Sequence, residues 1–180
     1  QQMRRSYRSD RYLGILDRVR TAIPHAAITT DIIVGFPGET EEDFQATLDV
    51  CSTARFTAAY TYQYSKRPGT PAATMPDQIS DAVVADRYTR LHNHQQGISL
   101  SVNQEAIGTH HKILVGDYEG RRDEAQARLT GRSEDFRLVH FDNTFVALPG
   151  DEVTVRITDA SAHYLIGDPL SVRQTRGAEA

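Results

Sequence analysis

An apolar and β-branched run from Ala27 to Val34 is followed at once by Gly-Phe-Pro-Gly at 35–38 and then by a helix start at Thr40. Such a continuous run is typical of a strand covered on both faces. Thr40 is a favourable N-cap residue, and the acidic residues 41–43 follow where the helix dipole favours carboxylates. A second strand pattern covers residues 58–64. The order strand, helix, strand predicts a βαβ unit with a parallel sheet.

This βαβ unit is too small to stand alone. Two strands do not make a stable sheet, and a closed (β/α)₈ barrel needs about 250 residues, whereas the chain has 180. We therefore expect the α/β part to be incomplete or to be completed by another chain. The first residue is Gln rather than Met, and we expect the chain to be a piece of a longer protein.

The second half of the chain has a different pattern. A loop over 65–76 and a long helix, with apolar residues in one stripe from Val84 to Val102, lead to Gly108. Short β patterns separated by glycine and proline follow at 110–115, 127–130, 138–141, 144–148, 153–158, 164–166 and 170–172. These predict a small antiparallel β-barrel of the OB-like kind. The expected fold class is thus α/β plus all-β, with a first part at 1–107, a barrel at 108–173 and a tail at 174–180.

Composition limits the classes of function. The net charge of −4 excludes a globally basic nucleic-acid binder but leaves room for a local basic face. A single cysteine excludes a disulfide framework and any cluster held by several thiolates of this chain. The paired histidines at 92/94 and 110/111 have spacings that turn their side chains apart, so we expect no metal site. No apolar run is long enough for a membrane span, which favours a soluble, cytoplasmic protein.

Three strings together resemble one family. They are Thr-Asp-Ile-Ile-Val-Gly-Phe-Pro-Gly-Glu-Thr at 30–40, Tyr-Ser-Lys-Arg-Pro-Gly-Thr-Pro-Ala at 64–72, and Met-Arg-Arg-Ser-Tyr at 3–7. In this order and spacing they resemble the radical S-adenosylmethionine methylthiotransferases. The terminal barrel is similar to a TRAM domain, the RNA-binding module of that family. The resemblance implies the last part of a radical S-adenosylmethionine (β/α) barrel, a connecting helix and a TRAM barrel.

The branch of the family is indicated by a few positions. Thr30-Asp31 and Arg67-Pro68-Gly69 resemble the tRNA-modifying branches rather than the ribosomal-protein branch. The tyrosines of 60–64 and Pro71-Ala72 favour the branch that adds a methylthio group to isopentenylated adenosine beside the anticodon. The branch acting on threonylcarbamoyl-adenosine and the ribosomal-protein branch stay open as alternatives.

The resemblance also implies cofactors and partners. Family members carry two [4Fe–4S] clusters, bind S-adenosylmethionine and the tRNA anticodon stem-loop, and receive electrons from a reductant protein. Cys51 is the chain's one cysteine and lies on the inner stripe of a predicted helix, where a packing role is expected. The cluster ligands would therefore lie outside this chain. We expect these 180 residues alone to be inactive, to hold no catalytic residue and to be monomeric.

Candidate site residues follow from the same resemblance. Those expected to border S-adenosylmethionine are Ile33, Val34, Gly35, Phe36, Pro37, Tyr64, Ser65 and Arg67. Those expected to contact RNA are Arg4, Arg5, Arg67, Arg128, Arg132, Arg137 and His140. The alternative for Phe36 and Pro37 is packing under the turn, and the alternative for the arginines is an ordinary surface role. The acidic residues at 39 and 41–43 disfavour a phosphate at this helix start and would tolerate a positively charged ligand.

A competing hypothesis from a different class remains. The chain could be a non-catalytic RNA-binding protein that keeps the partial α/β unit as a scaffold. Sequence upstream of Gln1 would separate the two, because the enzyme requires cysteines for both clusters there.

Overall fold

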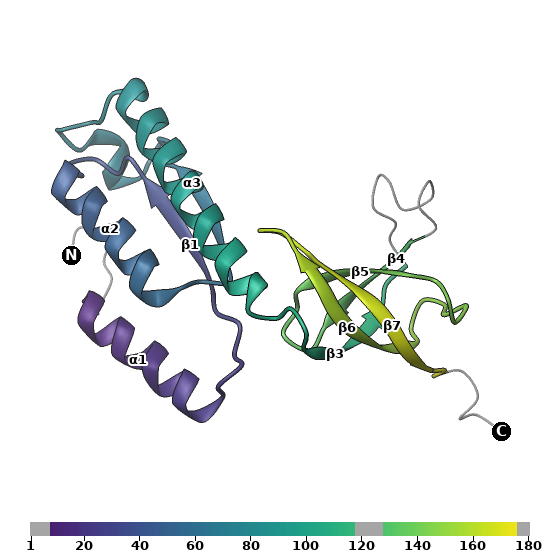
Figure 1. Cartoon of the computed structure of the whole chain (residues 1–180). Helices are drawn as coiled ribbons and strands as arrows, with labels where there is room; N and C mark the ends of the chain where they lie inside the picture. Colours follow the sequence, from purple (N-terminus) through teal and green to yellow (C-terminus); the bar gives the residue numbers. More distant parts are fainter. Residues whose placement is uncertain (1–7, 118–127, 176–180) are drawn as a thin grey trace. The chain divides into compact units, whose positions relative to one another are not determined.

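The computed structural model describes residues 8–117 and 128–175 (Figure 1). The chain divides into two compact units, residues 1–98 and 99–180. The elements in order are α1 (Ser9–Ala22), β1 (Thr29–Val34), α2 (Glu41–Ala54), β2 (Ala58–Gln63), the 3₁₀ helix η1 (Pro71–Thr74), α3 (Asp81–Gln104), β3 (His110–Val115), β4 (Arg128–Ser133), β5 (Leu138–Asp142), β6 (Glu152–Ala160) and β7 (Leu165–Arg173). An α/β unit is followed by an all-β unit, which confirms the expected fold class. Among the described helices, none combines the length and the apolar character that a membrane crossing requires.

The first unit is the predicted βαβ unit. Strands β1 and β2 pair in parallel, with Thr29 opposite Ala58 and Val34 opposite Gln63. Alternate residues of β1 turn inward, and Val34 is fully buried with Phe44 of α2 and Leu91 of α3. These three share one apolar core, so the helices cover one face of the two-stranded sheet.

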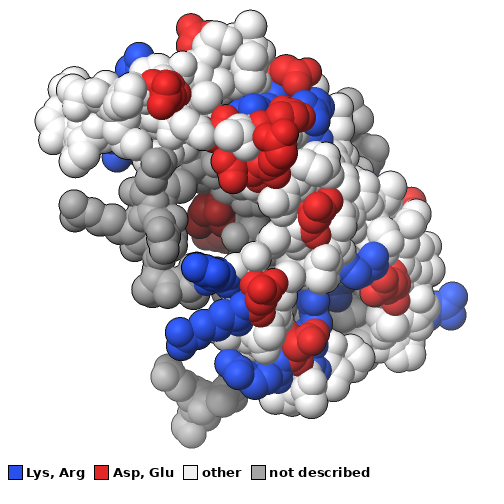
Figure 2. All heavy atoms as spheres, turned by 90° about the vertical axis from the view of Figure 1, so that its left-hand side faces the viewer, with Lys and Arg blue, Asp and Glu red and all other residues white. Residues whose placement is uncertain are grey.

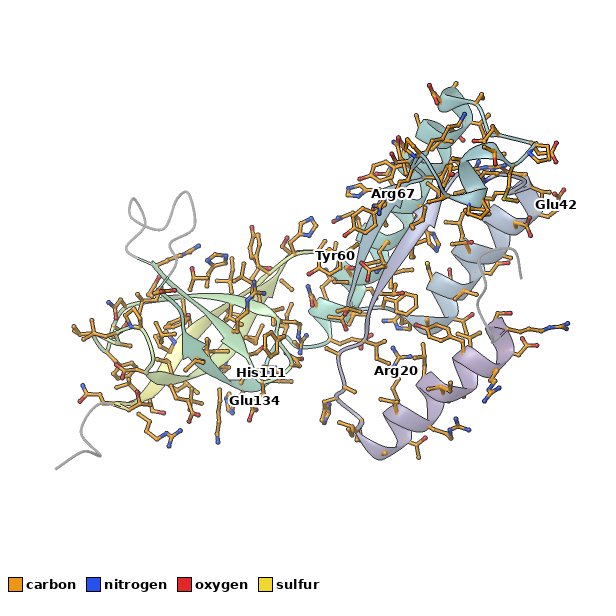
Figure 3. The ribbon with its side chains drawn as sticks, turned by 180° about the vertical axis from the view of Figure 1, so that it is seen from behind. Arg20, Glu42, Tyr60, Arg67, His111 and Glu134 are labelled. Atoms are coloured by element: carbon orange, nitrogen blue, oxygen red, sulfur yellow. The ribbon has the colours of Figure 1, made fainter. Side chains whose placement is uncertain are left out.

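The start and end of α2 are both capped. Thr40 and Asp43 form a capping box, each side chain accepting a hydrogen bond from the other's backbone N–H. At the other end Arg55 adopts a left-handed conformation. Arg20 of α1 donates to the carbonyl oxygens of Ala54 at 2.5 Å and Arg55 at 3.1 Å, and it points from α1 toward α2 in Figure 3. Its charge therefore stabilises the C-terminus of a neighbouring helix.

The other face of the same sheet carries large exposed side chains. Tyr60 and Tyr62 are 62% and 51% exposed, and Ile33 is 45% exposed. The parallel register places Asp31 opposite Tyr60 and Ile33 opposite Tyr62. Two tyrosines, an isoleucine and a carboxylate thus form a continuous surface on the face that the helices leave free.

The second unit is a closed barrel in the order β3-β4-β5-β7-β6. Four of its pairings are antiparallel, whereas β5 and β7 pair in parallel. The inward residues of the strands form one core, which includes Ile113, Phe141 and Val155, all at most 1% exposed. The strand predicted over 110–115 is confirmed as β3.

Two strand predictions were wrong. Residues 144–148 form a loop, because the Asn143 side chain accepts a hydrogen bond from the Ala147 N–H at 2.9 Å and Val146 adopts φ +53°. The two pieces predicted at 164–166 and 170–172 are one strand, β7, whose pairing with β6 contains register shifts. Residue 127, the predicted start of β4, lies outside the described residues.

Gly131→Ala tests the packing of the barrel. A Cβ at Gly131 would meet the Leu114 carbonyl oxygen at 2.4 Å, so backbone would have to shift. We expect the free energy of unfolding of the barrel to fall by about 1–3 kcal/mol. Gly97→Ala on α3 is the control, because a Cβ added there would meet nothing within 4 Å. This substitution should raise the free energy of unfolding by about 0.5–1 kcal/mol. Equal effects in urea titrations of the two variants would contradict this packing.

Candidate functional site

The turn at 35–39, where β1 leads into α2, is fixed by its own hydrogen bonds. The Gly35 N–H donates to Glu39 Oε2 at 2.6 Å, and the Glu39 N–H donates to the Phe36 carbonyl at 2.9 Å. The Gly38 N–H donates to the carbonyl of Asp77 at 2.9 Å, in the loop before α3. Gly35 and Gly38 both have φ +81°, which glycine adopts without strain.

A buried ion pair joins this turn to α3. Arg87 Nη1 lies 3.0 Å from Glu39 Oε2 and donates to the Glu39 carbonyl at 2.9 Å. The side chains of Arg87 and Glu39 are only 6% and 12% exposed. Arg87 Nε also lies 3.3 Å from Glu41 Oε2. One guanidinium thus pairs with two carboxylates at the start of α2.

A second arginine extends the network toward solvent. Arg90 Nη2 lies 2.6 Å from Glu41 Oε1, and its Nη1 lies 3.2 Å from Asp86. The hydrogen bond from Arg90 lowers the pKa of Glu41, and the same bond raises the pKa of Arg90. Both Arg87 and Arg90 stand over the Phe44 ring, at 5.7 and 4.7 Å from its centroid. Figure 2 shows acidic and basic side chains gathered together on the face that it presents.

This network supplies the positive charge at the acidic turn. The sequence suggested that a cationic ligand would be tolerated beside residues 39 and 41–43. In the structure Glu39 and Glu41 are already paired with arginines of α3, so these two carboxylates need no ligand to balance their charge.

The residues predicted to border S-adenosylmethionine fall into two groups. Val34, Gly35 and Pro37 are buried. A Cβ at Gly35 would lie 2.5 Å from Val84 Cγ2. The absence of a side chain at Gly35 therefore lets Val84 of α3 pack directly against the turn. Phe36 packs edge-on against Tyr64, with ring centroids 5.5 Å apart.

The remaining predicted residues, Ile33, Ser65 and Arg67, are exposed. The Arg67 carbonyl accepts hydrogen bonds from the Thr70 N–H at 3.2 Å and the Thr70 hydroxyl at 2.8 Å. This fixes the backbone of the loop and leaves the guanidinium in solvent, beyond the end of β2 (Figure 3). Ile33 is near the end of β1, and Ser65 and Arg67 follow the end of β2. The exposed group therefore lies at the carboxyl ends of two parallel strands, where α/β folds bind their ligands.

The Tyr64 hydroxyl is a buried polar group at the end of the β1–β2 sheet. The backbone N–H of Tyr64 donates to the Val34 carbonyl at 2.8 Å, which continues the β1–β2 pairing. The hydroxyl is buried and has no hydrogen-bond partner among residues 8–117 and 128–175. An unsatisfied buried hydroxyl is costly, so this end of the sheet has an unmet hydrogen-bond requirement.

Cys51 does not have the properties of a metal ligand. It is 1% exposed within the α/β core, and burial raises the pKa of its thiol to about 11. Metal ligation requires the thiolate. Within residues 8–117 and 128–175, no three His, Cys, Asp or Glu side chains are grouped as a metal site.

The barrel brings three of the predicted RNA-contacting residues, Arg128, Arg132 and His140, onto one surface. In the β4–β5 pairing Arg132 is opposite Leu138, Thr130 opposite His140 and Arg128 opposite Asp142. These pairs occupy the alternate positions that do not point into the barrel core. Arg132 is exposed, and its Nη1 donates to the Phe136 carbonyl at 3.1 Å.

The other predicted residues have protein partners. Arg128 lies 3.6 Å from Asp142, and Arg137 pairs with Asp135 at 2.5 Å. His140 Nδ1 is 3.1 Å from the Thr130 hydroxyl. Arg4 and Arg5 lie outside the described residues.

The barrel also exposes three basic residues that the sequence-based prediction did not include. His110, Lys112 and Arg156 are exposed, and His110 is opposite Arg156 in the β3–β6 pairing. Leu114 of β3 is opposite Arg132, so the outward side of β3 leads toward Arg132. The alternation of residues 110–115 could have identified His110 and Lys112, but the pairing with Arg156 depends on the barrel closure.

Comparison with known proteins identifies the barrel first. Residues 108–170 match the family model described as the TRAM domain, so the chain contains a TRAM barrel attached to a βαβ unit. It is 58% identical over 99% of its length to the tRNA-2-methylthio-N(6)-dimethylallyladenosine synthase of Mycolicibacterium smegmatis, 61% to that of Mycobacterium avium and 59% to that of Nocardia farcinica. Over nearly its whole length the chain is therefore similar to a part of these synthases.

The chain corresponds to only part of these relatives. It spans 35% of the M. smegmatis protein, 25% of the M. avium protein and 36% of the N. farcinica protein. The matched part is the C-terminal part of the relatives, which agrees with the expected place of the βαβ unit and the TRAM barrel.

Arg87→Met tests the buried ion pair. The substitution leaves Glu39 buried without its partner, so we expect the free energy of unfolding of the first unit to fall by about 3–5 kcal/mol. Arg90→Met is the matched control, because the Arg90 side chain is 40% exposed. This substitution should lower the free energy of unfolding by about 1 kcal/mol or less. Similar losses for both variants in thermal and urea unfolding would rule out a special role for Arg87.

Asp135 should make the barrel sensitive to acid. Burial alone would raise its pKa, but hydrogen bonds from Arg137 and Ser133 outweigh burial and lower the pKa below 3.8. The ionised form is therefore favoured by folding, so its stabilisation is present above pH 3.8 and is lost as the pH falls through the lower folded-state pKa. Asp135→Asn should flatten the pH dependence of barrel unfolding in that acidic range. An unchanged slope would exclude Asp135 as its source.

Proposed function

We propose that this chain is the C-terminal part of a tRNA methylthiotransferase, acting within a longer polypeptide on N6-isopentenyladenosine beside the anticodon. The observation that carries the proposal is the 58–61% identity over 99% of the chain to synthases named for that product. The TRAM match at residues 108–170 supports tRNA as the partner. The setting would be the cytoplasm, where tRNA is modified.

The barrel would supply RNA binding. Arg132 on β4, with Lys112 on β3 and Arg156 on β6, offers exposed cations for phosphate contacts. The described part of the second unit also contains several carboxylates, so affinity from the barrel alone should be modest and should fall with salt. We take residues 108–173 as the boundaries of this RNA-binding module.

The α/β unit would supply one wall of the S-adenosylmethionine site. Ile33, near the carboxyl end of β1, and Ser65 and Arg67, after the end of β2, are exposed. The guanidinium of Arg67 would pair with the carboxylate of the ligand. Val34, Gly35 and Pro37 would act by holding the turn. The unpartnered hydroxyl of Tyr64 fits a site that is completed from outside this chain. When bound, S-adenosylmethionine would supply the radical chemistry and the methyl group.

Iron–sulfur ligation does not fit this chain's residues. Cys51 is buried in the core and its thiol remains protonated at neutral pH. The ligands of both clusters, and the contact with a reductant protein, would belong to other segments of the longer protein. These 180 residues would therefore bind and orient S-adenosylmethionine and tRNA. They would hold no group that touches the clusters.

The test is made on the longer protein that contains this chain, purified with its clusters and assayed by mass spectrometry of tRNA nucleosides. We expect 2-methylthio-N6-isopentenyladenosine to form from isopentenylated tRNA. Arg67→Ala should raise the KM for S-adenosylmethionine severalfold, because a charge-assisted hydrogen bond is lost. Lys66→Ala is the matched control, being an adjacent exposed cation. Absence of the product, or modification of a protein instead, would overturn the proposed function.

A further inference from the structure

Phe136 is held in a conformation and an environment that do not suit phenylalanine. It lies in the β4–β5 hairpin, its side chain is 80% exposed and its φ is +67°. Three-residue hairpin loops of this kind normally place glycine at the left-handed position. Neither burial nor backbone preference therefore accounts for an aromatic ring here.

The hairpin is rigid around this residue. The Phe136 N–H donates to the Ser133 carbonyl at 2.9 Å, and the Ser133 N–H donates to the Arg137 carbonyl at 3.0 Å. Arg137 pairs with Asp135, whose carboxylate also accepts a hydrogen bond from the Ser133 hydroxyl at 2.5 Å. The ring of Phe136 is thus presented to solvent from a fixed tip.

Exposed basic side chains lie on β4 and on the neighbouring strand β3. Arg132 is exposed, and its guanidinium donates to the Phe136 carbonyl itself at 3.1 Å. Lys112 is exposed on the neighbouring strand β3. An exposed aromatic ring next to exposed cations combines the two elements that bind single-stranded nucleic acid, a stacking surface for a base and charges for the phosphates.

We propose that Phe136 stacks on an unpaired base of the bound RNA, while Arg132 contacts the adjoining phosphate. The inference rests on the proposed RNA-binding function and assigns the nucleotide-stacking position to the tip of the β4–β5 hairpin. An unpaired base is required, because a paired base has no free face for the ring. A protein partner would use the same ring through apolar contact and would not require its aromatic character.

Two substitutions separate stacking from folding. Phe136→Gly removes the ring and relieves the positive φ, so the barrel should be at least as stable as the original. Phe136→Leu keeps an apolar side chain and the same backbone constraint but has no aromatic face. Binding is measured with the full chain, at one low salt concentration, to an RNA hairpin with an unpaired loop and to the same stem closed as a blunt duplex.

Val146→Gly is the matched control. Val146 is also exposed, at 70%, and also has a positive φ of +53°, but it lies in the loop after β5 instead of in the β4–β5 hairpin. Its replacement by glycine relieves the same kind of backbone strain and removes a comparable apolar surface. It should leave RNA binding unchanged.

We expect Phe136→Gly and Phe136→Leu each to weaken binding of the looped RNA hairpin about tenfold. Binding to the duplex should be unchanged. Neither substitution should reduce folding or thermal stability. Equal hairpin binding by Phe136→Gly and the original chain would overturn the stacking inference while leaving RNA binding in place. Retained binding by Phe136→Leu would also overturn it, in favour of simple apolar contact. If the original chain binds neither RNA, the RNA-binding function of this chain fails together with the inference.

Discussion

The buried ion pair between Arg87 and Glu39 is the interaction on which the α/β unit depends. Glu39 also accepts a hydrogen bond from the Gly35 N–H, so one carboxylate connects the end of β1 to α3. The charge of Arg87 is shared with Glu41 at the start of α2. A strand end, a helix start and a second helix are thus held by one charge network. The exposed residues Ile33, Ser65 and Arg67 lie at the same end of the sheet.

This network was not predictable from sequence periodicity, and the reason is physical. The turn and the N-cap follow from local preferences of Gly35, Gly38 and Thr40, and both were expected, whereas the capping box with Asp43 appears only in the structure. The partner of Glu39 lies 48 residues away on α3, and no local pattern indicates which arginine of that helix will turn inward. The acidic turn was therefore interpreted as open to a cationic ligand, whereas its own chain supplies the cation.

The barrel shows the same division between local and distant information. Strand β3 was predicted with its correct bounds because it alternates regularly over 110–115. Residues 144–148 were mistaken for a strand because their apolar content resembles one, while the bond from Ala147 to the Asn143 side chain makes a loop. The exposed basic surface could be predicted on β4 and β5, but its extension to Arg156 required the closure of β3 against β6.

The two units have different chemical tasks in this account. The α/β unit would present a strand end to a cofactor that the rest of a longer protein encloses, and the barrel would bind RNA through cations and an exposed ring. Hydrogen exchange of the full chain, with and without the looped RNA hairpin, tests this division most directly. The account predicts slower exchange in the β4–β5 hairpin at 132–137 and in β3, with no change in β1 or in the loop at 143–150. Slower exchange in β1 or in the 143–150 loop, with none in the hairpin, would contradict it.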